Sequence, residues 1–252
     1  MFSKAIVRRP AETFANGITT SGLGKPDYNL ALKQHDAYCE ALIKCGLELT
    51  ILDADPNYPD SCFVEDTAVV IKDFGIIARP GDIRRLGEEM EIKKVLEPLL
   101  KLYTIEEPGK LDGGDVMQVD NKFYIGLSGR TNLQGVSQFS EIVKKYQFET
   151  FSIPVCNILH FKTGVNYLGE NNLLLHSSFC SKDDLKTYHQ VVVDADEEYA
   201  ANSLRINDYV LAPKGFPKTK SAIEKLGYKT IILDLSEYQK MDGGLSCLSL
   251  RF

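Results

Sequence analysis

Several motifs that mark common protein classes are missing from this sequence. Its six cysteines, at positions 39, 45, 62, 156, 180 and 247, form no Cys-x-x-Cys pair and show no zinc-ligand spacing. A chain of 252 residues can bury a full core without disulfide staples. We therefore expect the cysteines to be thiols and expect no structural metal.

Basic clusters and long apolar runs are absent as well. The 29 Lys and Arg residues face 35 Asp and Glu residues, which gives a formal net charge of −6. Nucleic-acid binding needs a basic stripe, so no nucleic acid is expected as a partner. No apolar stretch approaches the roughly 18–20 residues of a membrane span, and residues 1–10 lack the apolar run of a signal peptide. These absences predict a cytoplasmic protein that does not bind a membrane.

The composition that is present is typical of one globular domain. Charged residues make up 25% of the chain and hydrophobic residues 44%. No linker or low-complexity segment divides the chain, and single domains of roughly 200–250 residues are common. The prediction is a single domain over residues 1–252.

One order of elements recurs along the chain. Residues 63–78 predict a hairpin with its turn at Lys72-Asp73, and a helical stretch from about 82 to 103 follows. Similar hairpin and helix patterns return at residues 111–146, 163–190 and 201–226. A fifth copy opens at Gly243-Gly244 and can be completed only by the N-terminal strand of residues 5–7 and the helix after Asp27. Five such units at intervals of roughly 35–50 residues predict a closed ring of α/β repeats.

Polar side chains gather where the inner strand of each unit begins. They are Glu65, Asp66, Asp112, Asp115, Asn166, Asn202 and Cys247. In a closed ring these strand starts would lie near the common axis, where polar groups cost free energy unless a ligand or one another satisfies them. We therefore interpret them together as a candidate site.

Cys247 is the candidate nucleophile. It follows a glycine pair, and the alternation of residues 245–250 predicts a strand with Cys247 just inside it. A cysteine nucleophile needs a base and a group that orients the base. His160 in an apolar run could be that base or simply a core residue, and Asp112 could hold its ring or only accept backbone hydrogen bonds in a turn.

The surplus of acids predicts a cationic substrate. Cysteine amidases surround their thiol with hydrogen-bond donors, because the carbonyl oxygen of their substrate becomes an anion. Here Asp60, Glu65 and Asp66, together with Asp112, would supply acceptors instead. A guanidinium, which keeps positive charge on its nitrogens during attack at its central carbon, fits that environment.

Six motifs in order resemble those of one family. They are residues 59–67 (PDSCFVEDT), 79–81 (RPG), 111–115 (LDGGD), 126–132 (GLSGRTN), 159–164 (LHFKTG) and 242–252 (DGGLSCLSLRF). The family is the dimethylarginine dimethylaminohydrolases of the guanidine-modifying, or pentein, superfamily, and the resemblance runs from Gly17 to Phe252. It implies a five-bladed pentein α/β propeller with pseudo-fivefold ββαβ repeats, which agrees with the repeats described above.

The resemblance also implies roles for single residues. Cys247 corresponds to the nucleophile, His160 to the general acid/base and Asp112 to the acid that orients it. The implied substrate-binding residues are Asp66 and Glu65 at the guanidinium, Asp60 at the amino-acid end, Arg85 and Arg130 at the α-carboxylate, and Ile18 and Leu23 in a glycine-rich loop. Two departures are notable, because some members have leucine in place of Ile18 and some bacterial members have glutamate in place of Asp112. Arg85, beside Arg84, also reads as a solvated helix charge, and the glycine-rich loop also reads as a plain connector.

The implied reaction converts asymmetric dimethylarginine or monomethylarginine to citrulline plus dimethylamine or methylamine, through a thiouronium on Cys247. It needs no metal or organic cofactor, although a thiolate beside an imidazole can trap zinc and so be inhibited by it. The alternatives are an arginine or agmatine deiminase or an amidinotransferase of the same superfamily, and more remotely a non-catalytic pentein binding protein. The sequence leaves open the preference between mono- and dimethylarginine, the physiological role and the oligomeric state. It is compatible with a homodimer.

Overall fold

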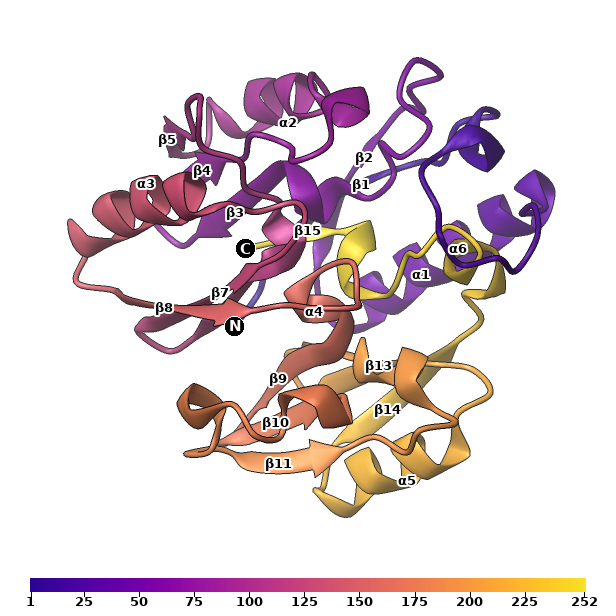
Figure 1. Ribbon diagram of the computed structural model, residues 1–252. Coiled ribbons are helices and arrows are strands. Elements are labelled where there is room, and N and C mark those ends of the chain that lie inside the picture. The colour runs from indigo at the N-terminus through magenta and orange to yellow at the C-terminus, as the bar shows by residue number, and fades with distance from the viewer. The chain divides into compact units, whose positions relative to one another are not determined.

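The computed structural model describes residues 1–252, and its strands form five sheets of three strands each (Figure 1). In every sheet the middle strand pairs antiparallel with one neighbour and parallel with the other. A parallel pair requires a crossover, and four of the five crossovers contain an α-helix. The number of repeats predicted from the sequence, five, is confirmed.

The chain divides into two compact units, one of Met1–Phe63 with Gly164–Phe252 and one of Val64–Thr163. The first unit holds three sheets and the second holds two. That the 252 residues act as one domain stays a prediction. None of the helices is both long enough and apolar enough to span a membrane.

The first sheet of unit 1 joins the two ends of the chain. Strand β1 (Lys4–Arg8) lies between β15 (Leu250–Arg251) and β2 (Glu48–Leu52), antiparallel to the first and parallel to the second. The backbone N–H of Lys4 also donates to the carbonyl of Phe252 over 2.8 Å. The fifth repeat is therefore assembled from both ends, as the sequence predicted.

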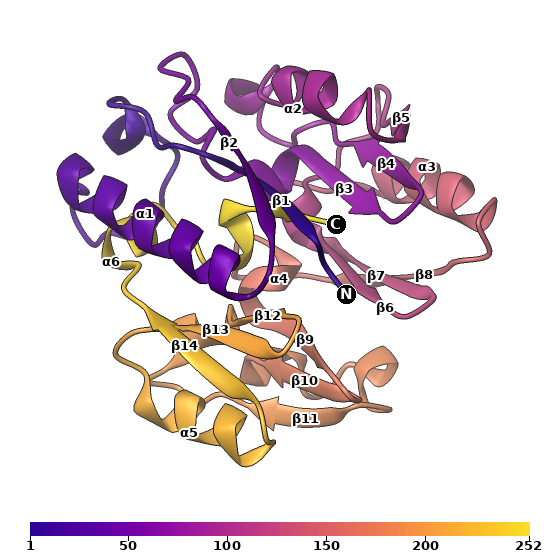
Figure 2. The ribbon, with the colours of Figure 1, turned by 180° about the vertical axis from the view of Figure 1, so that it is seen from behind.

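Helix α1 (Tyr28–Lys44) lies beside β1 and β2 in Figure 2. Its start is fixed by Asp27, whose side chain accepts the backbone N–H of Leu30 over 2.9 Å. It ends before Gly46, which has a φ of +92°, a backbone conformation that favours glycine. The helix buries Tyr38 and Leu42 in the core of the unit, beside the rings of Phe14, Phe63 and Tyr238.

The other two sheets of unit 1 have the same pattern. One contains β9 (Val165–Gly169), β10 (Asn172–Leu175) and β11 (His189–Val192), and the other contains β12 (Leu204–Ile206), β13 (Tyr209–Pro213) and β14 (Lys229–Leu233). The further helices are α5 (Pro217–Lys225) and α6 (Ser236–Gln239), with short 3-10 turns η1 (Phe14–Asn16), η5 (Ser177–Phe179), η6 (Asp183–Leu185), η7 (Glu198–Ala201) and η8 (Ser246–Leu248).

Unit 2 repeats the pattern twice. Its sheets are β3 (Ala68–Ile71), β4 (Phe74–Ile77) and β5 (Lys101–Thr104), and β6 (Val116–Val119), β7 (Lys122–Leu127) and β8 (Glu149–Pro154). Its helices are α2 (Glu89–Leu96), α3 (Leu133–Lys144) and α4 (Phe161–Gly164), which reaches the boundary of the unit, with 3-10 turns η2 (Val64–Thr67), η3 (Ile83–Arg85) and η4 (Gly113–Asp115). Its core packs the buried rings of Phe74, Phe123 and Phe139 between sheets and helices.

Three predictions of local structure were wrong. Cys247 lies in the 3-10 turn η8, not inside a strand, because the backbone N–H of Ser246 is drawn to the side chain of Asn202 over 3.0 Å. The helical stretch predicted for residues 82–103 is η3, α2 and the strand β5. The helix predicted at the end of the copy in residues 163–190 is absent, because residues 182–190 hold only the turn η6 before β11 begins and have few apolar residues to bury.

Candidate active site

The predicted catalytic residues and the two acids Glu65 and Asp66 occupy one recurring place in the repeats. A short helical turn precedes the first strand of each repeat, namely η2, η4, α4, η7 and η8. Glu65 and Asp66 lie in η2, Asp112 directly precedes η4, His160 directly precedes α4, and Cys247 lies in η8. Asn202 directly follows η7. The sequence pattern that placed polar residues at the strand starts is therefore a property of these turns.

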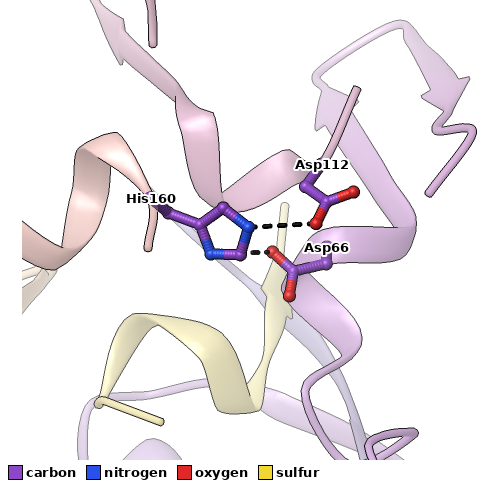
Figure 3. A group of neighbouring side chains, drawn as sticks. All are labelled: Asp66, Asp112 and His160. Carbon is purple, nitrogen blue, oxygen red and sulfur yellow. Dashed lines mark hydrogen bonds and ion pairs between the residues drawn. The ribbon is translucent and has the colours of Figure 1, made fainter. Parts of the chain in front are cut away.

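His160 is held between two carboxylates within unit 2 (Figure 3). Its Nε2 lies 3.0 Å from a carboxylate oxygen of Asp112, and its Nδ1 lies 3.8 Å from one of Asp66. All three residues are buried, with at most 4% of each exposed. Asp112 therefore occupies Nε2, while Nδ1 has only the more distant carboxylate of Asp66 beside it.

The surrounding charges keep this imidazole protonated. Burial alone would lower the pKa of His160, but the negative charge of Asp66, the hydrogen bond of Asp112 and the charge of Asp115 together raise that pKa to about 9. In return, the pKa of Asp66 falls to about 2, because the charges of His160 and Arg85 outweigh the effect of burial. At neutral pH the side chain of His160 is therefore an imidazolium, a proton donor, held between two carboxylates.

Two glycines let η4 approach η2 and His160 closely. A Cβ on Gly114 would lie 2.6 Å from a carboxylate oxygen of Asp66 and 2.9 Å from Nδ1 of His160, closer than real Cβ atoms come. A Cβ on Gly113 would lie 2.0 Å from the carbonyl oxygen of Glu65. The backbone N–H of Gly114 also donates to Asp66 over 3.0 Å. The glycines of the Asp-Gly-Gly-Asp motif are therefore needed for close packing around the histidine.

Asp112 does more than close a turn. One of its oxygens accepts the backbone N–H of Gly81 over 2.8 Å, while the other faces His160. Its side chain does not cap η4. The backbone N–H of Asp112 donates to Oγ1 of Thr131 over 3.2 Å. Both interpretations of Asp112 are partly right, because it accepts a backbone hydrogen bond and it also contacts the ring of His160.

Arg85 is buried and paired with two acids, so its interpretation as a solvated charge is wrong. Its Nε and Nη2 donate to Glu88 over 3.0 and 2.8 Å, and its Nη1 donates to Asp66 over 2.6 Å. Only 6% of its side chain is exposed. Burial lowers the pKa of Arg85, but the charges of Glu88 and Asp66 outweigh it and raise that pKa well above its usual value. Sequence reasoning missed Glu88, which follows Arg85 by three residues.

Arg130 retains an unused donor. Its Nη1 is buried without a hydrogen-bond partner and lies 3.6 Å from a carboxylate oxygen of Asp112. The backbone of Arg130 also packs against Gly81, where a Cβ would lie 2.2 Å from its carbonyl oxygen. A buried guanidinium with a free N–H can bind a carboxylate that a ligand brings.

Glu65 has a partner that sequence reasoning missed. Nζ of Lys162 lies 2.7 Å from a carboxylate oxygen of Glu65, and the two side chains are only 13% and 3% exposed. Lys162 falls two residues after His160, within one of the resembling motifs. The acids of unit 2 are therefore not a bare cluster, because a lysine, two arginines and an imidazolium accompany them.

Asp115 joins the segments that carry His160 and Arg130. One of its oxygens accepts the backbone N–H of Phe161 over 2.8 Å, and the other accepts the hydroxyls of Ser128 and Thr131 over 2.6 and 2.7 Å. It is completely buried, and burial raises the pKa of this carboxyl. Asp115 therefore supports the segments that carry His160 and Arg130.

The carboxylates around His160 could also offer ligand atoms to a metal. Asp66, Asp112 and His160 present one such atom each, all within 4.8 Å of one another. Metal binding requires a neutral imidazole, whereas this one is held protonated. A metal would therefore have to displace the proton that the two carboxylates stabilise.

Unit 1 holds the turn of Cys247 by hydrogen bonds from three sides. Tyr199 donates its hydroxyl to the carbonyl of Gly243 over 2.8 Å, and Tyr38 donates its own to the carbonyl of Leu245 over 2.9 Å. Asn202 accepts the backbone N–H of Ser246 over 3.0 Å. Burial and then the charge of Cys247 raise the pKa of Tyr199, so its hydroxyl stays a donor. No local pattern in the sequence marks the two tyrosines, because their contacts span 44 and 207 residues.

The other predicted binding residues of unit 1 lie on the glycine-rich loop and beneath it. Both carboxylate oxygens of Asp60, which is 5% exposed, accept the backbone N–H of Ile18 over 3.2 and 3.0 Å. Leu23 is 54% exposed. The structure thus brings Asp60 and Ile18 together and leaves Leu23 on the surface of the loop.

Raising the pH should remove the stabilisation that His160 contributes. Its pKa of about 9 lies above the value of 6.5 for an unperturbed histidine, so the contribution is complete below about pH 6.5 and is lost as the pH rises through 9. The difference in unfolding free energy between wild type and His160→Gln should shrink by roughly 3 kcal/mol between about pH 6 and about pH 9.5. Urea unfolding at both pH values measures it, with His189→Gln, at the exposed start of β11, as the control. A difference independent of pH would contradict the charged state of His160.

Comparison with known proteins identifies the family. A family model described as N,N dimethylarginine dimethylhydrolase, eukaryotic, matches residues 17–208. The chain is 42% identical over 254 residues to N(G),N(G)-dimethylarginine dimethylaminohydrolase of Pseudomonas aeruginosa, covering all of both chains. It is 34% identical over 251 residues to the protein of that name from Streptomyces coelicolor, covering 98% of this chain and 96% of the relative.

Solved structures agree with this assignment. A structure of the Pseudomonas aeruginosa enzyme, a Cys-to-Ser mutant complexed with citrulline, matches with a TM-score of 0.99 at 42% identity over the whole of both chains. The N-terminal domain of ArgZ, an arginine dihydrolase from cyanobacteria, matches with a TM-score of 0.89 at 17% identity, covering 100% of this chain and 97% of that one, which shows the fold alone. The predicted fold class, the five-bladed α/β pentein fold, is confirmed. With a family model over most of its length and a relative 42% identical from end to end, this chain belongs to the dimethylarginine dimethylaminohydrolase family.

Proposed function

We infer that this protein hydrolyses Nω-methylated arginines to citrulline and releases dimethylamine or methylamine. Two relatives named for this reaction share 42% and 34% of their residues with it along nearly the full chain. The structural observation that carries the proposal is the buried imidazolium of His160 beside Asp112. A substituted guanidinium has a poor leaving group until its nitrogen is protonated, and such an imidazolium is suited to supply that proton.

In the first half-reaction Cys247 is the nucleophile. A bound cationic guanidinium favours the thiolate over the thiol, because a nearby positive charge lowers the pKa of a thiol. The sulfur bonds to the central guanidinium carbon, and the bond from that carbon to the methylated nitrogen breaks. His160 gives its Nδ1 proton to the departing amine, which leaves a thiouronium on Cys247 and a neutral imidazole.

In the second half-reaction His160 acts as the base. The neutral imidazole takes a proton from water, and the resulting hydroxide equivalent attacks the thiouronium carbon. The carbon–sulfur bond then breaks and the second proton of that water passes through solvent to the released amine, which leaves citrulline, the thiolate of Cys247 and the imidazolium of His160. Asp112 holds Nε2 throughout, so that one nitrogen performs both proton transfers. No cofactor is needed for either half.

The remaining predicted residues bind the ends of the substrate. Arg130, with its unpartnered Nη1, and Arg85 are proposed to hold the α-carboxylate, and Asp60 the α-ammonium, with Ile18 and Leu23 on the covering loop. Asp66 and Glu65 are proposed to face the unmethylated guanidinium nitrogens. Each of these carboxylates is shared with a cation of unit 2, Glu65 with Lys162 and Asp66 with Arg85.

A panel of guanidines tests the proposal. A pocket that accepts one or two methyl groups discriminates by roughly 1–3 kcal/mol, or about 10–200-fold. We expect kcat/KM for monomethyl- and asymmetric dimethylarginine to exceed that for arginine by at least about tenfold. Symmetric dimethylarginine should be rejected, because one of its methyls would meet the acceptor carboxylates. Citrulline release at matched concentrations of each compound is the measurement.

The rival activities of the superfamily give different results in the same assay. Arginine used as well as or better than the dimethylated compound would replace the proposal with a deiminase for arginine. Agmatine, which has no α-carboxylate, should not be used, because Arg130 would lack its partner. An amidinotransferase would need an added amine as acceptor, so citrulline formation in its absence separates the two.

We propose that the protein acts in the cytoplasm as a single domain on a small-molecule substrate, without nucleic acid or membrane. A homodimer is proposed as its assembly, to be measured by light scattering at several protein concentrations. Molar mass at that of the 28.2 kDa chain at every concentration would exclude the homodimer.

A further inference from the structure

The glycine-rich loop, residues 16–26, is bound to the segment that precedes Cys247. Thr20 donates both its backbone N–H and its hydroxyl to one carboxylate oxygen of Asp242, over 2.6 and 3.0 Å. The hydroxyls of Thr19 and Ser21 both donate to the carbonyl of Lys240, over 2.8 and 2.6 Å. Four hydrogen bonds therefore join the centre of the loop to residues 240–242.

Little apolar burial supports the loop beyond these contacts. Thr19 and Thr20 are exposed, and the apolar Leu23 is 54% exposed. Gly22 and Gly24 have φ values of +66° and +88°, and a Cβ on either would meet nothing within 4 Å. The bond of Ile18 to the buried Asp60 anchors the start of the loop, but beyond it residues 19–25 are held mainly by solvent-accessible hydrogen bonds, and such a segment can open at low cost in free energy.

The segment that follows Asp242 is packed tightly. A Cβ on Gly243 would lie 2.3 Å from the ring of Phe63, and one on Gly244 would lie 2.5 Å from the side chain of Asn202. Tyr199 fixes the carbonyl of Gly243. From Gly243 to Cys247 the backbone therefore has no room to move with the loop.

Asp242 lies at the junction between the open loop and the packed turn. Its φ of +57° is unusual for a residue with a side chain, and its backbone N–H donates to the carbonyl of Gln239 over 3.2 Å. We propose that Asp242 is the latch of the glycine-rich loop, a positioning residue that holds Thr20 against the turn before Cys247 and releases it when ligands exchange. The proposal rests on the proposed function in one respect, that Cys247 is the nucleophile which the closed loop shields.

The chemistry of the pair suits a reversible latch. Hydrogen bonds to a charged carboxylate are stronger than neutral ones, yet in contact with water a broken pair is readily solvated. Losing the hydrogen bonds between Thr20 and Asp242 should shift the equilibrium between the closed and the open loop by about tenfold. The loop would then open more often without any change in the turn that carries Cys247.

Asp242→Gly removes the latch and keeps the backbone, because glycine adopts a positive φ without strain. Asp120→Gly is the matched control: Asp120 is an exposed aspartate with a φ of +52° in the turn between β6 and β7. Asp242→Asn keeps the left-handed backbone and one oxygen acceptor, so it should change the same quantities in the same direction by less. Thr20→Val should also act in that direction, and combining it with Asp242→Gly should add nothing further.

Two rates report on the loop without any substrate. Thermolysin cleavage before Leu23 should be about tenfold faster in Asp242→Gly than in wild type, and iodoacetamide should alkylate Cys247 faster by a similar factor. The exposed thiol of Cys156 is the internal reference for alkylation, measured by peptide mass spectrometry. If either rate in Asp242→Gly stays at the level of Asp120→Gly, the latch is overturned. Should Asp242→Gly fail to fold, Asp242→Asn is judged by the same two rates.

Steady-state kinetics then distinguish a positioning role of Asp242 from a distortion of the turn that carries Cys247. With the latch removed, KM for the best methylarginine should rise about tenfold while kcat stays within about threefold, because closure must be driven by substrate alone. A fall in kcat with KM unchanged would overturn the proposal, since it would indicate a disturbed Cys247. If wild type turned over no guanidine at all, the proposed function would fail, while the two substrate-free rates would still decide on the latch.

Discussion

Cys247→Ser is expected to abolish citrulline formation and leave the fold intact. Serine keeps the shape of the side chain, but its hydroxyl has no lowered pKa and is a far poorer nucleophile than a thiolate. The other hydroxyl of η8, on Ser246, is buried and accepts a hydrogen bond from Asn202 over 3.2 Å. A loss of at least about 10³-fold in kcat/KM is expected.

The fold should tolerate this change because the turn does not depend on the sulfur. The hydrogen bonds that hold it come from Tyr199, Tyr38 and Asn202 and reach the backbone of neighbouring residues. Cys247 is only partly buried against the core of unit 1. Thermal unfolding within a few degrees of wild type, together with the kinetic loss, is the expected pair of results.

The matched control is another partly exposed thiol of unit 1. Cys180 is partly exposed, as Cys247 is, and is remote in sequence from η8. The variant Cys180→Ser should therefore retain wild-type turnover. Cys62, nearest the acids in sequence, is a worse control because it is completely buried and a serine hydroxyl there would cost stability. Substantial citrulline formation by Cys247→Ser would assign the nucleophile to another residue.

The repeats could be predicted because their signals are local. Each hairpin shows alternating apolar residues and a turn, and positive φ values at Asp120, Asn171 and Asn207 mark three of those turns. The third strands carried weaker signals. Most residues of strands β5, β8, β11 and β14 are exposed or half-exposed, so no alternation of buried and exposed residues identifies these strands. The sequence therefore predicted where repeats begin better than where they end.

The 3-10 turn of Cys247 shows why a local pattern can mislead. Residues 245–250 alternate as a strand would, yet only Leu250 and Arg251 pair with β1. Asn202, which is 44 residues away, draws the backbone of Ser246 into the turn instead. Periodicity reports which residues share a face, but it cannot report a side chain from another repeat that captures a backbone group.

The site residues were accessible to sequence reasoning, but their partners were not. Cys247, His160 and Asp112 fall in ordered motifs, whereas the role of Asp115 depends on Phe161, 46 residues later. Glu88 and Lys162 look like ordinary surface charges in the sequence, and both are in fact partners of buried groups. An expectation of bare acids therefore became, in the structure, a network in which each buried carboxylate has a donor.

His160→Gly is expected to separate the two halves of the proposed reaction. The first half can proceed slowly without the histidine, because solvent can protonate the departing amine. The second half needs a base to activate water, and no other residue replaces Nδ1 of His160, whose Nε2 side is closed by Asp112. General acid–base catalysis is worth about 10²–10⁴-fold, so loss of the base should slow hydrolysis of the thiouronium by that factor.

The variant should therefore accumulate a covalent adduct on Cys247 after mixing with asymmetric dimethylarginine. Removing the ring also removes the positive charge that lowers the pKa of Asp66, while Arg85 remains paired with that carboxylate, so the surrounding side chains should keep their places. Intact-mass analysis at successive times gives the fraction of adduct, and digestion places it on Cys247. The double variant His160→Gly with Cys247→Ser is the control that should form none. Prompt turnover without accumulation would show that another group activates water and that His160 serves only to hold Asp66 and Asp112 in place.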